Sequence, residues 1–99
     1  MKIKDIAKEE RPRERMFLHG ASVLSDAELL AVVLQKGTRG ENVVDVSNRL
    51  IAKYGIDKLS SLSLVELQSI NGIGLAKAMQ IKACFELSKR VKVKGGVVC

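Results

Sequence analysis

The hydrophobic residues of this chain recur three and four positions apart, which is the spacing of one face of an α-helix. This pattern predicts five helices, over Pro12–His19, Ser25–Lys36, Asn42–Tyr54, Ser63–Ile70 and Leu75–Arg90. The second is apolar on nearly every side, so we expect it to be central. Gly55 should end the third, and residues 56–62 should form a connection of about one helical turn. We therefore predict an all-α domain over residues 1–90. Residues 91–99 should form a linker, or else an isolated edge strand.

Several predicted helix starts are marked by residues that can pair free backbone groups. Pro12 stands where a first-turn proline belongs. Ser25 with Glu28, and Ser63 with Glu66, have the spacing of a capping box. In that arrangement the serine oxygen and the carboxylate each accept a hydrogen bond from a backbone N–H. These positions therefore predict where the second and fourth helices begin.

The last predicted helix carries apolar residues on two sides. One side holds Ala78, Ile81 and Phe85, and the other holds Ala76, Ala83 and Leu87. We therefore expect this helix to pack against neighbours on both sides. Phe17, Tyr54 and Phe85 occupy apolar positions of their helices and are expected in the core. Cys84 is expected to be a small buried residue.

A short sequence occurs twice and divides the chain into two similar units. Leu24-Ser25-x-x-Glu28-Leu29 is repeated as Leu62-Ser63-x-x-Glu66-Leu67. Each copy is followed by a helix, a turn with glycines and another helix, although the first copy has a longer first helix and one extra turn residue. Chance explains a six-residue match more easily than it explains this order of elements. We interpret the chain as a tandem helix-hairpin-helix domain, (HhH)2-like, preceded by a short helix.

The second turn, Asn71–Gly74, carries the most specific pattern. The helix-hairpin-helix pattern h-x-x-h-x-G-h-G-x-x-x-A-x-x-h, where h is apolar, is matched by Leu67, Ile70, Gly72, Ile73, Gly74, Ala78 and Ile81. Gly72 and Gly74 are expected to reach positive φ and to let another backbone approach. Ile73 should anchor the hairpin in the core, and Ala78 should let the two helices cross closely.

Such a hairpin leaves unpaired N–H groups at the start of the next helix, where the positive end of the helix dipole also lies, and a phosphate fits there. Lys77 and Lys82 could add charge-assisted hydrogen bonds. The alternative is a tight turn without function, because a lone Gly-x-Gly is a weak signal. In the first turn, Gly37–Gly40, Thr38 replaces the apolar anchor. Arg39 there could reach a second phosphate, or the turn could be a purely structural pseudo-repeat.

The charge of the chain is concentrated next to the second turn. The net charge is +6, and residues 1–70 carry eleven Lys and Arg against ten Asp and Glu, whereas residues 71–99 carry six against one. A surplus that begins at a glycine turn favours an anionic partner over an ordinary solvated face. Aromatic residues make up only 3% of the chain, so few rings are available to stack on bases. Contacts to DNA would therefore be weak, salt-dependent and indifferent to base sequence.

Other classes of protein fit the sequence less well. No apolar run approaches the roughly 20 residues that span a bilayer and no signal peptide is recognisable, so no membrane is expected and the cytoplasm is the expected location. Cys84 and Cys99 are too few for a disulfide framework. His19 is the only histidine and is expected to end a helix rather than bind a metal. With no cluster of metal ligands, P-loop or paired nucleophile and base, the chain is not expected to be an enzyme.

Four separated motifs make the chain similar to one family. They are Arg11-Pro12-Arg13-Glu14, Leu24-Ser25-Asp26-Ala27-Glu28-Leu29-Leu30, Gly37-Thr38-Arg39-Gly40 and Asn71-Gly72-Ile73-Gly74-Leu75-Ala76-Lys77-Ala78. In this order they resemble the N-terminal region of the RadC-like proteins, prokaryotic proteins traditionally labelled DNA repair. The resemblance extends over residues 11–90 and implies a DNA-binding part of a longer protein.

The resemblance also implies roles for individual residues. The phosphate donors would be the N–H groups of Gly72, Gly74 and Lys77. A monovalent cation, bound by some members of the wider hairpin family, would lie against the carbonyls of Gln68, Ile70 and Ile73. Full-length RadC-like proteins continue into a JAB/MPN-type domain with His and Asp zinc ligands. Those ligands are not in this chain, so no cofactor is expected in it.

Three hypotheses for the function follow. The first is a DNA-binding module that holds backbone without reading sequence. The second is a protein-interaction or dimerisation domain on the same helical scaffold, with no nucleic-acid role. The third, an enzyme in its own right, has the least support because the sequence offers no catalytic constellation.

Overall fold

The chain folds into helices joined by short turns. The computed structural model describes residues 11–91. Its elements are α1 (Pro12–His19), the 3-10 helix η3 (Ala21–Val23), α2 (Asp26–Leu34), α3 (Val43–Ser61), α4 (Leu64–Gln68) and α5 (Leu75–Lys89). No β-strand occurs in the described range, so the all-α prediction is confirmed. The predicted linker lies outside the described residues except for Val91.

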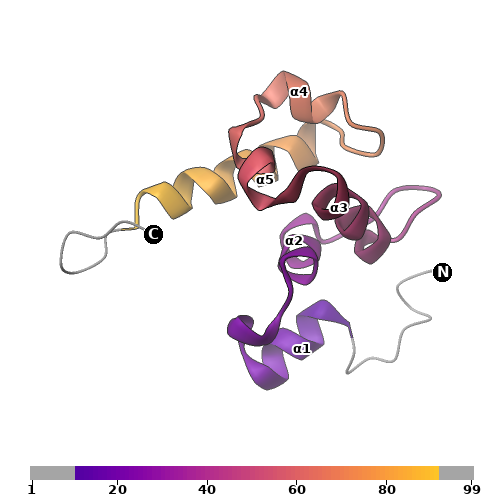
Figure 1. Ribbon diagram of the computed structural model, residues 1–99. Coiled ribbons are helices and arrows are strands. Elements are labelled where there is room, and N and C mark those ends of the chain that lie inside the picture. The colour runs from indigo at the N-terminus through magenta and orange to yellow at the C-terminus, as the bar shows by residue number, and fades with distance from the viewer. Residues whose placement is uncertain (1–10, 92–99) are drawn as a thin grey trace.

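The second helix is central, as its apolar sequence predicts. In Figure 1, α1 lies below α2, and α3, α4 and α5 form the upper part of the molecule. α2 contacts α1, α3 and α5, and α4 contacts α5. An ion pair of 2.7 Å between Arg15 Nε and Glu28 Oε2 links α1 to α2. The two helix-turn-helix units, α2 with α3 and α4 with α5, therefore pack around one shared core.

Both predicted capping boxes are present. The N–H of Glu28 donates to Ser25 Oγ at 3.2 Å, and the N–H of Ser25 donates to Glu28 Oε1 at 3.0 Å. Ser63 and Glu66 form the same pair of bonds, at 3.1 and 2.9 Å. The backbone N–H of Ser25 lowers the pKa of Glu28, and that of Ser63 lowers the pKa of Glu66. Both carboxylates thus stay ionised at the starts of α2 and α4.

Three helix ends differ from the sequence prediction. α4 ends at Gln68 rather than at Ile70, and the N–H of Ile70 bonds Leu67 O at 3.1 Å in the tighter turn that follows. α2 ends at Leu34, two residues early, because Gln35 takes φ 68° and ψ −49° and the N–H of Lys36 bonds Leu34 O at 2.7 Å. This is a γ-turn, which cannot continue a helix. Gly55, at φ 76°, breaks α3 where a break is predicted. The connection that follows it is helical as far as Ser61.

The core is built from aliphatic side chains of α2, α3, α4 and α5 and of the turns that join them. Its buried members are Leu30, Ala31, Leu34, Val43, Val46, Leu50, Leu59, Leu62, Leu67, Ile73, Ala78 and Ile81. Tyr54 and Phe85 are partly buried and pack against this cluster, as expected. Leu67, Ile73, Ala78 and Ile81 come from the hairpin pattern, so the pattern serves the core as well as the turn.

Some residues expected to be buried are exposed. Phe17 is 89% exposed, although α1 packs against η3 and α2. Cys84 is exposed. Ala76, Ala83 and Leu87 are exposed as well, so only one of the two apolar sides of α5 is covered within residues 11–91. Expectations of burial for these residues are therefore wrong in the described structure.

Candidate nucleic-acid interface

The two glycines of the second turn have different geometries. Gly72 has φ +90°, and a Cβ there would lie 3.0 Å from Arg49 Nη2 and 3.2 Å from Thr38 Cγ2. A side chain at this position would be strained by the positive φ, and Arg49 and Thr38 would have to shift to admit it. Gly74 has φ −86° and ψ −173°, and a Cβ there would meet no atom within 4 Å. The expectation of a positive φ holds for Gly72 and is wrong for Gly74.

Ile73 anchors the hairpin in the core, as predicted. Its side chain is only 3% exposed, although both neighbouring glycines are more accessible. Its N–H donates to Ile70 O at 2.9 Å and closes the turn. Ala78 is fully buried one turn into α5, where α4 and α5 meet. The apolar positions of the pattern thus hold the hairpin backbone at the surface in one orientation.

The start of α5 has no side-chain cap. Ser25, Asn42 and Ser63 each accept a hydrogen bond at the starts of α2, α3 and α4, whereas Gly74 begins α5 without one. The first backbone bond of α5 runs from Ala78 N–H to Gly74 O, at 3.0 Å. The earlier N–H groups of a helix have no acceptor within it. A dipole end of this kind can accept an anion.

The N–H groups that the family resemblance implies as phosphate donors are consistent with this geometry. Gly72, Gly74 and Lys77 donate none of the backbone hydrogen bonds that the described turns and helix ends form. Gly74 is exposed, and Lys77 and Gly72 are half-buried. The phosphate role itself stays a prediction.

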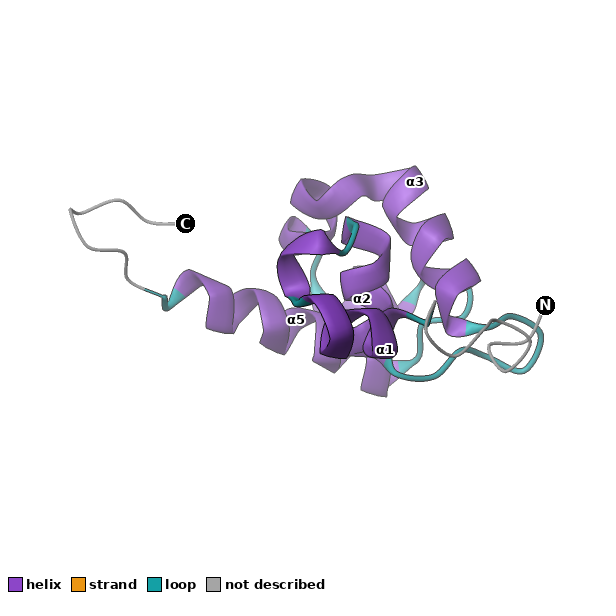
Figure 2. Cartoon of the chain, turned by 90° about the horizontal axis from the view of Figure 1, so that it is seen from below, coloured by secondary structure: helices purple, strands orange, loops and turns teal. Residues whose placement is uncertain are grey.

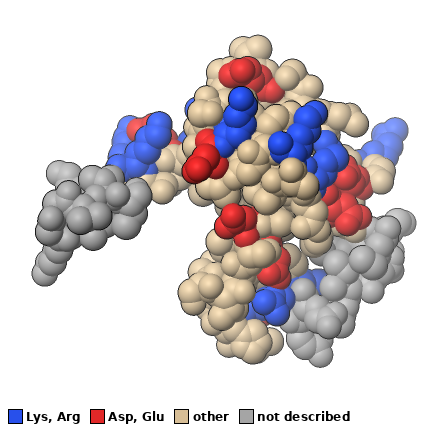
Figure 3. All heavy atoms as spheres, viewed as in Figure 1, with Lys and Arg blue, Asp and Glu red and all other residues tan. Residues whose placement is uncertain are grey.

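The other basic residues singled out in the sequence lie in different settings. Lys82 Nζ donates to Leu62 O at 3.0 Å, so Lys82 ties α5 to the end of α3. Arg39 is exposed at the tip of the first turn. Figure 3 shows Lys and Arg side chains gathered over the upper part of the molecule, interspersed with Asp and Glu. Of the six basic residues in 71–99, Lys92 and Lys94 lie outside the described range.

Arg49 of α3 connects the two turns, and the sequence analysis missed it. Its guanidinium donates to Glu41 Oε1 at 2.9 Å and to Glu41 Oε2 at 3.2 Å. It also donates to Asn71 O at 2.8 Å. A single arginine thus holds the first turn through Glu41 and the second through Asn71. No local pattern marks it, because both partners are brought to it by the fold.

The first turn is built differently from the second. Thr38 N–H donates to Glu41 O at 2.8 Å, and Glu41 N–H donates to Thr38 O at 3.4 Å. A Cβ at Gly37 would collide with the backbone of Glu41 and Asn42. Arg49 lowers the pKa of Glu41, chiefly through their hydrogen bond, and the carboxylate in turn raises the pKa of Arg49. The pair is therefore fully ionised at neutral pH.

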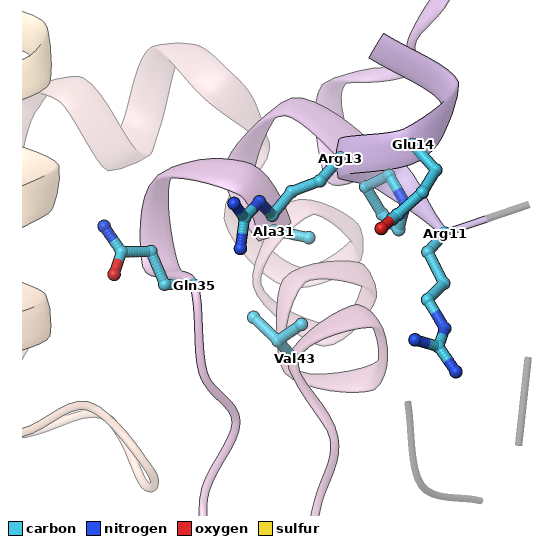
Figure 4. Close-up of a pocket in the computed structure, with 7 residues that line it drawn as sticks. Arg11, Arg13, Glu14, Ala31, Gln35 and Val43 are labelled. Carbon is cyan, nitrogen blue, oxygen red and sulfur yellow. The ribbon is translucent and has the colours of Figure 1, made fainter. Parts of the chain in front are cut away.

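Pockets on the described surface include one beside the hairpin and one away from it. One, of about 360 Å³, lies beside the hairpin and is lined by Arg49, Leu50, Lys53, Tyr54, Ser69, Ile70 and Asn71. In it, Lys53 Nζ is 5.4 Å from the centroid of the Tyr54 ring. The other, of about 190 Å³, lies among α1, α2 and α3 and shares no lining residue with the hairpin. Figure 4 shows Arg13 reaching across it toward Ala31, and Arg11 pointing away.

Residues 11–91 show neither a cluster of metal ligands nor a helix that could span a membrane. Within residues 11–91, no group of three or more His, Cys, Asp and Glu side chains lies close enough together to hold a metal. Ile70 O, one of the carbonyls proposed for a monovalent cation, already accepts the Ile73 N–H. None of the described helices combines the length and the apolar character needed to cross a bilayer.

The comparisons with known proteins give one consistent result. Residues 3–79 match the family described as UPF0758 N-terminal. A UPF0758 protein of Pelodictyon phaeoclathratiforme is 53% identical over 92% of this chain and 41% of its own length. UPF0758 protein CT0611 of Chlorobaculum tepidum is 50% identical over 96% and 46%, and a UPF0758 protein of Methanococcoides burtonii is 45% identical over 94% and 41%. No solved structure matches.

The fold and the matched region together define an all-α N-terminal domain with an exposed glycine hairpin. The chain belongs to the UPF0758 family, which is the family that the RadC-like motifs predict. It spans less than half the length of the relatives described above.

Proposed function

We propose that this chain binds the backbone of DNA without reading base sequence, as the DNA-binding module of a RadC-like repair protein. The observation that carries the proposal is the start of α5. It follows the Gly72 turn, begins at Gly74 without a side-chain cap, and has Lys77 in its first turn. Unpaired N–H groups, a positive dipole end and an ammonium group together suit a phosphate.

The surroundings of the hairpin support a phosphate ligand. Open space at Gly74 leaves room for an external group to approach the backbone. Arg49 holds the turn by its hydrogen bond to Asn71 O, and the buried side chain of Ile73 anchors the turn in the core. A rigid donor set loses less entropy on binding than a mobile one. Arg39 is exposed on the first turn, and its guanidinium is the proposed second contact to the DNA backbone.

The same geometry favours contacts that are indifferent to sequence. Main-chain N–H groups and a lysine ammonium recognise phosphate and sugar, which are the same at every base pair. Tyr54, beside the hairpin, packs partly into the core. Phe17, an exposed ring, belongs to α1 rather than to the hairpin. Stacking on bases is therefore not part of the proposed mode.

The proposed role of this part of the protein is to hold DNA while any chemistry occurs elsewhere. The relatives are more than twice as long as the matched region. In the RadC-like arrangement, the remaining part would carry the zinc-dependent domain. The cytoplasm, where prokaryotic DNA lies, is the proposed location.

A titration of labelled duplex DNA at several salt concentrations tests the proposal. We expect a dissociation constant in the micromolar range or weaker that rises steeply with salt, as for other binding to phosphates. Lys77→Glu should weaken binding by about tenfold. Lys89→Glu is the matched control, because it makes the same charge change about 18 Å along the same helix. It should weaken binding by no more than about threefold.

Two results would reject DNA binding by the hairpin. One is the absence of binding at low salt. The other is equal weakening by Lys77→Glu and Lys89→Glu, which would indicate only a general charge effect. If DNA binding is absent and light scattering shows a mass that rises with concentration, the interaction or dimerisation domain becomes the better interpretation.

A further inference from the structure

The side of α5 that faces away from the core is an apolar surface without a partner in the described structure. It is formed by Ala76, Met79, Ala83 and Leu87, which are spaced three and four positions apart and so lie in one stripe. All four are exposed, Met79 by 49% and Leu87 by 67%. Ordinary surface helices carry polar residues on this side. We call this surface the outer face of α5.

The outer face is continuous and extends to the end of the helix. From Ala76 to Leu87 it is roughly 17 Å long at the rise of an α-helix. Leu75 and Val91 prolong it at the two ends, with exposures of 50% and 54%. The second half of α5 projects beyond the other helices (Figures 1 and 2). A neighbour could therefore contact this half without displacing any other described element.

We propose that the outer face of α5 is the docking surface for the C-terminal part that the longer relatives carry. The matched region is an N-terminal domain that covers only 41 to 46% of those relatives. α5 is the last described helix of this N-terminal domain. A segment joined to its docking surface by a short linker has a high effective concentration, so a modest apolar patch suffices to hold it.

The charges around the outer face disfavour a second copy of the same chain as the occupant. Between Leu75 and Arg90, α5 and its cap carry Lys77, Lys89 and Arg90 at exposed or half-buried positions, against the single acidic residue Glu86. The fourth basic residue, Lys82, is turned to Leu62 O on the packed side. Glu86 is already paired with Arg90, at 3.3 Å. Two copies would bring like charges together. The docking partner should therefore present an apolar centre with acidic residues around it. This inference does not depend on DNA binding.

The exposed thiol of Cys84, next to the outer face, offers a direct test. Alkylation of Cys84 is followed by mass spectrometry of the α5 peptide, in the 99-residue chain and in the chain extended to the length of its relatives. We expect alkylation to be at least about tenfold slower in the extended protein, because reaction of a thiol requires access. Leu87→Arg should restore the fast rate. Val65→Arg, at an apolar position of α4 that is 75% exposed, is the control and should leave protection intact.

Equal reactivity of Cys84 in the short and extended proteins would overturn the proposal. Protection that survives Leu87→Arg would also overturn it, provided that circular dichroism shows an unchanged helix content. Light scattering tests the remaining alternative, in which two copies of the chain pair through the outer face. A doubled mass of the 99-residue chain that Leu87→Arg abolishes would show that a second copy occupies the outer face.

Discussion

The guanidinium of Arg49 donates a 2.8 Å hydrogen bond to the carbonyl oxygen of Asn71, which lies 22 residues further along the chain. Because the same guanidinium also grips the carboxylate of Glu41 with two bonds, the orientation of the hairpin depends on α3 and on the first turn. A Cβ at Gly72 would come within 3.0 Å of this guanidinium. The hairpin and its arginine therefore form one structural unit.

Removal of the arginine should destabilise the domain. Arg49→Met loses the bidentate pair with Glu41 and the bond to Asn71, and we expect a loss of about 1–2 kcal/mol in the free energy of unfolding. Arg39→Met, at an exposed position of the first turn, is the control and should change stability by less than about 0.5 kcal/mol. Urea denaturation measures both. Equal stability of the two variants would show that the Arg49 bonds contribute nothing.

The domain should lose stability in acid, partly through Glu41. Arg49 keeps the pKa of Glu41 below its ordinary value in the folded state. The pair therefore contributes stability above the pKa of the unfolded chain, and this contribution is lost as the pH falls through the lower, folded pKa. Urea midpoints should decline between about pH 5 and pH 3, and less steeply in Glu41→Gln. The pH dependence that remains in Glu41→Gln should come from other carboxylates with lowered pKa, such as Glu28 and Glu66. An identical slope in Glu41→Gln would contradict this assignment.

The two hairpin glycines should respond differently to alanine. Gly72→Ala forces a side chain into positive φ and against Arg49, which should cost about 1–3 kcal/mol of stability. Gly74→Ala meets no atom, and its stability cost should be about 0.5 kcal/mol, from the poorer helix start. If phosphate approaches Gly74, the same variant should nevertheless bind DNA several-fold more weakly. Thermal unfolding and the duplex titration separate these two effects.

Two lysines of α5 should have separable roles. Lys82→Met removes the donor to Leu62 O and should cost about 1 kcal/mol of stability. Lys77 forms no such bond in the described structure. Lys77→Met should therefore leave stability nearly unchanged while weakening DNA binding. Urea denaturation and anisotropy on both variants test this division. A Lys82→Met protein as stable as the original would show that the Leu62 contact is not needed.

Local interactions explain which parts of the fold could be predicted. The capping boxes at Ser25 and Ser63 involve atoms three residues apart, so their sequence spacing was sufficient to locate the helix starts. The hairpin pattern likewise identified Ile73 as a core residue, and helical spacing with Ile81 identified Ala78. Positive φ at Gly72 followed from the hairpin pattern. The hairpin pattern was therefore enough to locate the turn and the start of α5, which form the candidate site.

The features that the sequence did not reveal depend on neighbours that are distant along the chain. The link from Arg49 to Asn71, the bond from Lys82 to Leu62, and the exposure of Phe17 each depend on how separate helices are placed. Periodicity shows that a helix has an apolar side, but it cannot show whether another element covers that side. The outer face of α5 is the clearest case. Its residues are those of a packing surface, and the helices of residues 11–91 leave it open.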